Sequence, residues 1–396
     1  MGSRKTRRRS LVGSIARSLG KSAFKLVDAK LGDRAASPES AKAAFDPERY
    51  RHLRIMKIVE ENTRAKSFYF EELDRSETPF QAGQYLTVEV YLEGRVYRRA
   101  YSLMSPALPG APRAFTVERI KDGKVSNHLL DFYEEGMLLR ARGPSGDFTL
   151  DFAEERLGKN GIGEIHLFAS GNGVTPILSL IETLLAQREN RLTLIKHDRE
   201  GEPRLFEARV DALAKAHGER LRVERIQGLD SGTLDPLFER LRAARELIEA
   251  RGASDAPPKP LVYLCGPRSF RETLGEAIER EGIRRSRIIE ERFESPPSLA
   301  LVELPEAPQP VALRARGETY RFEVPQGTTL LDAAIESGAP LPHRCMIGDC
   351  ASCVVRVESG EAWSATNDAL SKREREQGII LACVSHPLSE MEIEIP

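Results

Sequence analysis

The chain has 396 residues, and at roughly 150 residues per domain this length predicts two or three compact domains. Its 59 Lys and Arg nearly balance 60 Asp and Glu, so the chain lacks the overall basicity of a protein that coats nucleic acid. It contains no run of 18 apolar residues, so a membrane-spanning helix is not expected. The five Cys are too few for a disulfide scaffold, yet four of them fall between Cys345 and Cys383, which points to a cofactor in a reducing compartment.

The two ends of the chain carry opposite charge. Residues 1–30 hold nine Lys or Arg against one acid, whereas residues 305–396 hold eight basic and fourteen acidic side chains. We treat residues 1–45 as a basic tail and expect the asymmetry to concern partners rather than fold.

Within the basic tail, apolar residues recur at helical spacing from Leu11 to Leu26 among Lys and Arg. This pattern is typical of an amphipathic helix that lies on an anionic membrane, but a solvated leader without fixed structure is the alternative. Arg7–Arg9 resembles part of a twin-arginine signal, but Arg17 and Lys21 interrupt the stretch that would have to be apolar. We therefore expect a cytoplasmic protein, with peripheral membrane contact left open.

Three further domains are predicted after the tail. Residues 50–152 read as short strands and turns, which favours an antiparallel barrel. In residues 160–295 apolar runs alternate with helical stretches, which favours a doubly wound parallel sheet. Residues 296–310 form a proline-rich linker, and residues 311–396 combine short strands with one helical turn.

The strands expected in the first two of these domains are Arg54–Val59, Tyr85–Val90, Arg99–Leu103, Ala114–Ile120, Leu138–Arg142, Ile165–Ala169, Arg191–Ile195, Leu221–Ile226 and Leu261–Leu264. The expected helices are Asn127–Phe132, Pro176–Gln187, Phe206–His217, Leu234–Ala250 and, in the last domain, Leu330–Glu336.

The last domain carries the sharpest motif. Cys345, Cys350 and Cys353 follow the spacing C-x4-C-x2-C, and Cys383 comes after 29 intervening residues. This is the plant-type spacing for a [2Fe–2S] cluster, in which four soft thiolates hold two irons. A structural zinc site is the alternative, but it usually shows two close pairs of ligands, and here only one such pair exists. Gly348 provides for a tight turn, and small residues beside the cysteines let backbone N–H groups approach the sulfurs.

A second motif follows the strand Ile165–Ala169. Gly171-Asn172-Gly173-Val174-Thr175-Pro176 would let a phosphate-bearing ligand approach the free N–H groups of a helix N-terminus. The third glycine of the dinucleotide fingerprint is absent, so an ordinary strand-to-helix turn is the alternative. Cys265-Gly266-Pro267 ends a later strand, at the sheet edge where open parallel sheets bind ligands, although Cys265 alone is equally an ordinary buried thiol.

A third motif, Arg99-Ala100-Tyr101-Ser102, closes a strand of the barrel. Arg grips phosphate, Tyr stacks on a flat ring and Ser bonds a ring nitrogen, so the motif would suit a flavin nucleotide; ordinary packing is the alternative. Gly123-Lys124-Val125-Ser126 opens a helix and is a second candidate anion site, with helix capping as the alternative.

These motifs, in this order, resemble the ferredoxin reductase superfamily, specifically its single-chain NAD(P)H-dependent reductases. The resemblance covers residues 50–396 and implies a flavin-binding β-barrel, a nicotinamide domain and a β-grasp-like α+β ferredoxin domain. It implies that Arg99 holds the flavin phosphate, that Tyr101 packs on the flavin ring and that Ser102 lies near its N5.

The resemblance also assigns further cofactor-binding residues. It implies a second phosphate turn at Lys124, Val125 and Ser126, beside the strand residues Val117–Arg119, and this second turn favours FAD over FMN. Gly143–Phe148 resembles the turn that closes the barrel.

In the nicotinamide domain the resemblance assigns cofactor-binding roles to Gly171, Asn172, Gly173, Thr175 and Pro176, and to the loop Cys265, Gly266 and Pro267 beside the hydride-donating ring. Glu291 and Phe293 resemble the segment that lies near the flavin. We expect Ser102, Cys265 and Glu291 to be the catalytic residues. Met346 departs from the family, because relatives often carry Arg there.

The choice between NADH and NADPH stays open. An acid after the second strand favours the ribose hydroxyl of NADH, whereas an arginine favours the 2′-phosphate of NADPH. The sequence offers Asp198 for the first, and Arg199 and Arg204 for the second.

The predicted reaction follows from electron counts. A nicotinamide delivers two electrons as hydride, whereas an iron–sulfur cluster accepts one at a time, so a flavin must stand between them. The resemblance implies an oxygenase, hydroxylase or desaturase as acceptor, and the acidic last domain would favour a basic docking face on it. We expect a monomer that binds no nucleic acid. The alternatives are a flavin-free [2Fe–2S] module for electron transfer or redox sensing, and a membrane-anchored scaffold.

Overall fold

The computed structural model describes residues 50–73, 78–92, 95–158, 162–198, 201, 203–249, 260–293 and 302–396. The basic tail, Arg199 and part of the proline-rich linker, for which predictions were made above, lie outside the described residues. No helix in the described ranges is both long enough and apolar enough to cross a bilayer.

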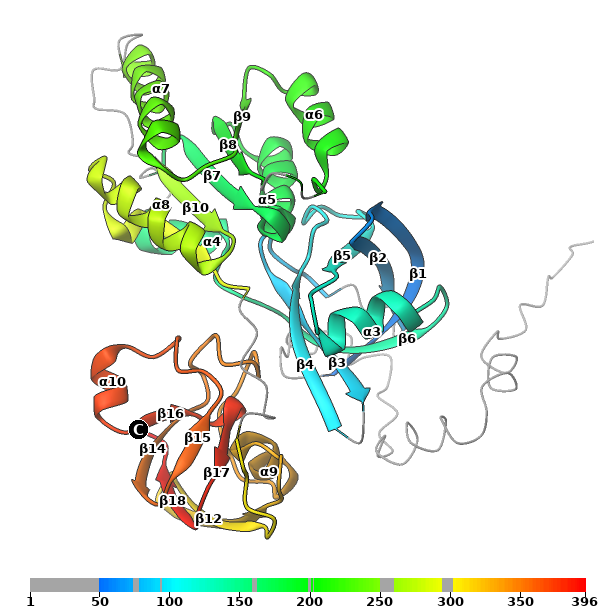
Figure 1. The fold of residues 1–396 in the computed structure, drawn as a ribbon, viewed down its shortest axis with the longest axis vertical. Coiled ribbons are helices and arrows are strands. Elements are labelled where there is room, and N and C mark those ends of the chain that lie inside the picture. The colour runs from blue at the N-terminus through cyan, green and yellow to red at the C-terminus, as the bar shows by residue number, and fades with distance from the viewer. Residues whose placement is uncertain are drawn as a thin grey trace, which may run out of the picture. The chain divides into compact units, whose positions relative to one another are not determined.

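The first domain is a six-stranded antiparallel barrel (Figure 1). Its strands are β1 (Arg51–Asn62), β2 (Ala65–Glu72), β3 (Tyr85–Leu92), β4 (Arg95–Ser102), β5 (Arg113–Glu118) and β6 (Leu138–Ser145), in the order β4-β3-β6-β1-β2-β5. A bridge between Leu103 and Phe115 joins the two edges, because it brings the end of β4 beside β5. Closure leaves one face of each strand to fill the interior, where Phe68, Val88 and Leu129 are fully buried.

Helix α3 (Lys124–Phe132) covers this barrel core with Val125 and Leu129. The sequence analysis predicted this helix three residues too short and missed β2 altogether. It also predicted a turn at Gly143–Phe148, whereas Gly143, Pro144 and Ser145 are the last residues of β6, so the turn begins only at Gly146.

The second domain is a five-stranded parallel sheet. Its strands are β7 (Ile165–Ser170), β8 (Leu192–His197), β9 (Leu221–Ile226), β10 (Leu261–Cys265) and β11 (Ile288–Glu291), in the order β11-β10-β7-β8-β9. Its helices are α4 (Leu150–Leu157), α5 (Val174–Gln187), α6 (Glu207–Ala216), α7 (Ser231–Glu249) and α8 (Arg268–Arg280). Neither α4, α8 nor β11 was predicted.

Both faces of this sheet are buried, which explains why its strands read as continuous apolar runs. Leu167 and Leu194 point into one core with α5 and α6, whereas Phe168 and Ile195 point into another with α7 and α8. Figure 1 shows α5 and α6 on one side of the sheet and α7 and α8 on the other. The doubly wound prediction is confirmed.

The third domain is a mixed sheet with one packed helix. Its larger sheet has the order β13-β12-β18-β14-β16, and α9 (Leu330–Glu336) buries Leu330, Leu331 and Ala334 in the core. The remaining elements are β12 (Gln309–Ala315), β13 (Glu318–Val324), β14 (Val354–Ser359), β15 (Ala362–Ser364), α10 (Lys372–Glu376), β16 (Ile379–Leu381), β17 (Ser385–Pro387) and β18 (Met391–Glu394). Gln309 and Pro310, predicted as linker, are the first residues of β12.

A buried carboxylate at the end of β2 ties the barrel together. Glu72 accepts from Arg113 at 2.8 Å and from Thr78 Oγ1 at 2.8 Å, and Arg51 lies 3.2 Å away. A buried carboxylate is tolerated only when cations and donors surround it in this way.

We expect Glu72→Gln to lower the free energy of unfolding of the barrel by about 3 kcal/mol, because it leaves buried arginines without their counterion. The neighbouring Glu71→Gln is the control: Glu71 pairs with Arg54 at the surface, and its loss should cost less than about 1 kcal/mol. Urea denaturation followed by the intrinsic fluorescence of the barrel tyrosines measures both. Equal effects of the two substitutions would contradict this account.

Candidate functional site

The predicted flavin motif lies on β4, which pairs with β3. Opposite residues in the pair are Val88 with Arg99, Leu86 with Tyr101, and Tyr85 with Ser102. Since side chains alternate along a strand, Arg99 and Tyr101 share the barrel-interior face, and Ser102 shares the outer face with Tyr85.

Tyr101 is buried with its ring centroid 5.4 Å from that of Phe115, and burial raises the pKa of its hydroxyl. Burial likewise lowers the pKa of the partly buried Arg99, whose Nη1 donates to the Arg98 carbonyl at 2.7 Å. A cation is therefore held in a partly desolvated place, as phosphate binding requires.

Two buried serine hydroxyls have no hydrogen-bond partner among the described residues. Ser102 is 4% exposed and Ser126 is 5% exposed, and the Oγ atom of each is unpaired. Because buried polar groups are almost always hydrogen-bonded, such atoms indicate positions where a ligand completes the bonding. A flavin nucleotide supplies ring and phosphate acceptors for both, so these residues fit the group that the sequence predicts there.

The start of α3 brings the second predicted phosphate turn toward β4. Lys124 Nζ lies 3.3 Å from the hydroxyl of Tyr97, two residues before Arg99. Gly123 is the N-cap without a side-chain cap, and Ser126 lies inside the helix, so the capping alternative for Ser126 is wrong.

Val117 and Arg119, predicted from the strand beside this turn, take different positions. Val117 is fully buried in the barrel core. Arg119 forms an exposed pair with Asp131 of α3, with one contact at 3.2 Å. The Arg119 guanidinium is therefore engaged by Asp131 of the same helix that carries Ser126.

The glycine-rich loop after β7 packs directly on the end of β10. A Cβ on Gly173 would lie 2.2 Å from the carbonyl oxygen of Cys265, so only glycine fits there. Gly171 has a φ of +55°, and Thr175 Oγ1 donates to the Asn172 carbonyl at 2.8 Å. The two nicotinamide motifs, far apart in sequence, therefore form one site.

The first turn of α5 is open to a ligand. Pro176 lies in that turn, no side chain caps the helix, and the buried Oδ1 of Asn172 has no partner within the described part of the chain. Free backbone N–H groups at a helix N-terminus attract pyrophosphate, so this loop fits a dinucleotide.

Cys265 and Glu291 are paired neighbours on β10 and β11. Both are fully buried, and burial raises the pKa of the Cys265 thiol and of the Glu291 carboxyl. Gly266 is confined, because a Cβ there would lie 2.7 Å from the Phe270 ring. Pro267 is the N-cap residue of α8, and Phe293 is half-buried against the sheet core.

Tyr85 of the barrel contacts the ferredoxin domain. Its hydroxyl lies 3.4 Å from Asp349 Oδ2 in the cysteine loop. Burial raises the pKa of Tyr85, and the charges of Cys345, Asp349 and Glu291 raise it further. Sequence reasoning missed Tyr85 and Asp349; the signals available were a tyrosine opening a strand opposite Ser102 and an acid inside the C-x4-C spacing.

The four predicted cluster cysteines come together in the third domain. Thiol hydrogen bonds from Cys350 and Cys383, with backbone N–H groups of Ile347 and Asp349, lower the pKa of Cys345. A hydrogen bond with Cys383 lowers that of Cys353. Backbone amides directed at a sulfur are the interactions that stabilise cluster thiolates.

The cysteine loop has the tight turns that its sequence predicts. Gly348 has a φ of +84°, and a Cβ there would lie 2.7 Å from Thr366. Met346 and Ala351 also adopt positive φ, and Met346 is buried in the domain core. Within the described ranges, no three His, Cys, Asp or Glu surround one point as a single metal ion requires. A [2Fe–2S] cluster needs two protein sulfurs for each iron, four in all, which equals the number of cysteines in the motif.

Two of the predicted nicotinamide-specificity residues, Asp198 and Arg204, line a pocket of about 400 Å³ at the ends of β8 and β9. Both carboxylate oxygens of Asp198 lie 2.7 Å from Lys196 Nζ. Arg225 and Arg240 also line the pocket but are paired with Glu207 and Glu224, whereas the exposed Arg204 forms no ion pair with the described residues.

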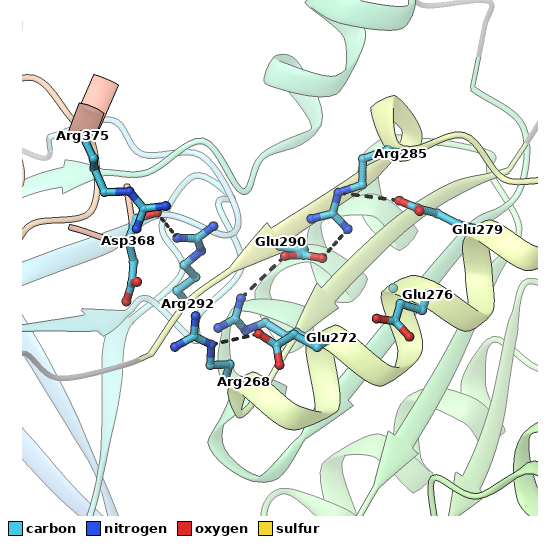
Figure 2. Close-up of a pocket in the computed structure, with 11 residues that line it drawn as sticks. Arg268, Glu272, Glu276, Glu279, Arg285, Glu290, Arg292, Asp368 and Arg375 are labelled. Carbon is cyan, nitrogen blue, oxygen red and sulfur yellow. Dashed lines mark hydrogen bonds and ion pairs between the residues drawn. The ribbon is translucent and has the colours of Figure 1, made fainter. Parts of the chain in front are cut away.

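A second pocket, of about 360 Å³, lies outside this constellation (Figure 2). Its charges are largely paired with one another, as Arg268 with Glu272 at 2.9 Å and Arg285 with Glu290 at 2.6 Å. We therefore do not count it as part of the electron-transfer site.

Comparison with protein-family models assigns all three domains. Residues 52–150 match an oxidoreductase FAD-binding domain, residues 167–275 an oxidoreductase NAD-binding domain and residues 313–388 a 2Fe-2S iron-sulfur cluster binding domain. These matches confirm FAD, NAD(P)H and [2Fe–2S] as the cofactors and contradict the flavin-free alternative.

Curated relatives match this chain over most of their length and most of its own. The chain is 30% identical to the ferredoxin reductase component of 3-ketosteroid-9-alpha-monooxygenase from Mycobacterium tuberculosis, over 85% of this chain and 93% of the relative. It is 29% identical to a component of the 1,2-phenylacetyl-CoA epoxidase from Escherichia coli, over 78% and 86%. It is 26% identical to the reductase component of glycine betaine monooxygenase from Pseudomonas aeruginosa, over 87% and 95%.

Among solved structures, phthalate dioxygenase reductase has the same fold, with a TM-score of 0.63 and 24% identity over 87% of this chain and 98% of that one. The chain is thus an oxidoreductase that passes electrons from NAD(P)H through FAD to a [2Fe–2S] cluster. By this shared domain order and its relatives, it belongs to the ferredoxin reductase superfamily, among the single-chain NAD(P)H-dependent reductases with a C-terminal plant-type [2Fe–2S] domain.

Proposed function

We propose that this chain is the reductase component of a multicomponent oxygenase, hydroxylase or desaturase, and that it delivers single electrons from its cluster to that partner. The relatives named above are components of two monooxygenases and an epoxidase. The last domain has fourteen acids against eight basic residues in residues 305–396, which favours an acceptor with a basic docking face.

The observation that carries this proposal is the contact between the flavin-site strands and the cysteine loop. Tyr85 lies opposite Ser102 of β4 and its hydroxyl is 3.4 Å from Asp349 Oδ2, and Thr87 Oγ1 donates to the Cys345 carbonyl at 2.9 Å. Electron transfer within one chain requires its cofactor sites to lie close together, because each electron must pass from one cofactor to the next without a diffusing carrier.

We assign roles to the predicted residues on this basis. Arg99, Lys124 and Ser126 hold the FAD phosphates, while Tyr101 and Ser102 position its ring, with Val117 and Val125 packing beneath. Gly171, Asn172, Gly173, Thr175 and Pro176 receive the nicotinamide pyrophosphate. Cys265, Gly266 and Pro267 line the place of the hydride-donating ring, with Glu291 and Phe293 beside it. Cys345, Cys350, Cys353 and Cys383 hold the cluster.

The protein side of the reaction is positioning. FAD, when bound, supplies the chemistry that converts a two-electron donor into one-electron transfers. The chain keeps water away from the reacting end through the fully buried Cys265 and Glu291, and Ser102 offers an unpaired hydroxyl there. We further propose a cytoplasmic monomer, with residues 1–30 as the segment for any contact with an anionic membrane.

The acceptor assignment is tested by reoxidation of the reduced chain. The oxygenase components of the three relatives' systems should reoxidise it at least about tenfold faster than dioxygen alone, because a dedicated partner docks specifically. The variant Cys350→Ser should lose iron and this transfer while retaining FAD and its reduction by NAD(P)H. Cys265→Ser is the control for iron content, since its thiol is remote from the cluster set. Reoxidation at the dioxygen rate with every acceptor would count against the proposal.

Ser102→Ala tests the orphan hydroxyl. We expect FAD to remain bound and its reduction by NAD(P)H to slow by about tenfold, because a donor at the reacting end of the ring is lost. Ser67→Ala is the matched control: Ser67 is equally buried in the barrel, but its hydroxyl bonds Thr116 at 2.8 Å. Stopped-flow absorbance under anaerobic conditions measures both rates, and an unchanged rate in the Ser102 variant would contradict its assigned role.

Arg204, in the pocket at the ends of β8 and β9, favours binding of a 2′-phosphate, because its guanidinium forms no ion pair with the described residues and Lys196 already engages the Asp198 carboxylate. We expect Arg204→Ala to raise KM for NADPH by about tenfold and to leave KM for NADH nearly unchanged, since the 2′-phosphate is the only charge that differs. Steady-state ferricyanide reduction with both nucleotides measures this. A parallel change for the two nucleotides would refute a role at the 2′ position.

A further inference from the structure

Strand β4 carries two adjacent arginines whose side chains point to opposite faces. Arg99 points to the barrel interior with Tyr101, whereas Arg98 lies opposite Glu89 on the outer face. Ser102 and Tyr85 lie on that same outer face, where β4 ends and β3 begins. The outer face of the β3–β4 pair therefore runs from the reacting end of the flavin site to Arg98.

Arg98 bridges the barrel and the ferredoxin domain. Its Nη1 donates to Asp332 Oδ2 at 2.9 Å, and its Nη2 lies 2.9 Å from Asp332 Oδ1, so the contact is bidentate. Asp332 belongs to the first turn of α9 and also accepts from Thr329 Oγ1 at 2.8 Å. The two oxygens are thus held in the orientation that a guanidinium fork needs.

The barrel holds the guanidinium in place from behind. Glu89, across the strand pair, accepts from Arg98 Nε at 2.7 Å and from the hydroxyl of Tyr50 at 2.8 Å. Arg140 reaches the other oxygen of Glu89 at 3.2 Å. Arg98 is therefore preorganised before the ferredoxin domain arrives, which lowers the entropy cost of docking.

Docking places the cysteine loop on the same outer face. Thr87, between Tyr85 and Glu89 on that face, donates from Oγ1 to the carbonyl of Cys345 at 2.9 Å, and both residues are buried. Cys345 is one of the four assigned cluster ligands. One hydrogen bond thus separates the barrel strand next to Ser102 from a ligand of the cluster.

Other contacts with the ferredoxin domain differ in kind. Arg142 Nη1 of the barrel makes a single contact of 3.3 Å with His343 Nε2. Arg344 and Asp147 lie 3.5 Å apart with side chains 34% and 55% exposed, and Arg292 of the nicotinamide domain donates to the backbone carbonyl of Asp368 at 2.7 Å beside the pocket of Figure 2. Arg98 and Asp332 are only 13% and 24% exposed and form two contacts. Exposed single pairs contribute little, whereas a shielded bidentate pair contributes more.

We infer that the Arg98–Asp332 pair is a docking latch that holds the cysteine loop against Thr87, and that electron flow from the flavin site to the cluster depends on it. This inference rests on the proposed function. Arg98 is a positioning residue: only its backbone carbonyl, which a side-chain substitution leaves in place, contacts the predicted flavin site through Arg99, and its guanidinium acts by keeping the ferredoxin domain in contact with β3.

The test uses the full chain with both cofactors, under anaerobic conditions and without an acceptor. In Arg98→Gln, flavin reduction by NAD(P)H should keep its wild-type rate, while the later bleaching of the cluster should slow by about tenfold. The matched control is Arg140→Gln, which also removes a cation from Glu89 but contacts nothing in the ferredoxin domain in the described structure, and cluster bleaching should stay within about twofold of wild type.

A second readout does not depend on electron transfer. In Arg98→Gln, backbone amides of residues 341–345 should exchange with deuterium at least about fivefold faster than in wild type, since loss of the latch opens the contact with Thr87. Should Arg98→Gln fail to fold, Asp332→Asn removes the same pair from the ferredoxin-domain side and is measured in the same way.

A double-mutant cycle separates a direct pair from two unrelated effects. If the latch exists, Arg98→Gln with Asp332→Asn slows cluster bleaching no more than either single variant. The inference would be overturned if both single variants kept the wild-type rates of cluster bleaching and amide exchange. It would also be overturned if the effects of the two substitutions on the bleaching rate multiplied in the double variant. Failure of NAD(P)H to reduce the flavin in the wild-type chain would instead refute the proposed function. In that case the deuterium-exchange measurement alone would decide whether the Arg98–Asp332 latch exists.

Discussion

The requirement that three differently built domains place their reacting ends in one small volume governs this structure. Parallel sheets present loops and helix N-termini at the carboxyl ends of their strands, and there Gly173 packs on the Cys265 carbonyl with no room for a Cβ. The barrel contributes the end of β4, and the third domain contributes the cysteine loop. Tyr85 and Thr87 of β3 join the last two, because Tyr85 lies opposite Ser102 and contacts Asp349, and Thr87 bonds the Cys345 carbonyl.

Much of this arrangement was predictable from the sequence because the signals are local. Cysteine spacing predicted the cluster loop, and apolar runs predicted the doubly wound sheet, including the bounds of β9; the bounds of α9 in the third domain were also predicted. Strand β2 was missed because Ser67 and Glu72 are buried polar residues that hide its alternation. Helix α8 was missed although Phe270, Leu274 and Ile278 recur every fourth residue, because Arg and Glu occupy half of the positions between them.

Other features depend on contacts between distant residues and leave no mark in a local pattern. Arg119, expected on the strand beside the second phosphate turn, forms a surface pair with Asp131 of α3. Strand alternation directs Arg98, which precedes Arg99 of the flavin motif, to the outer face and to Asp332, 234 residues later. The fit of Ser102 and Ser126 to a ligand likewise became visible only when their hydroxyls were found buried without partners among the described residues.

The central claim is that paired electrons enter this chain and leave it one at a time through two resident cofactors. An anaerobic reductive titration of the purified chain, followed by flavin absorbance and by the paramagnetic signal of the reduced cluster, counts the electrons it takes up. The account predicts about three per chain, two at the flavin and one at the cluster. Uptake of only about two, with no paramagnetic signal, or of only one, with no change in flavin absorbance, would contradict it.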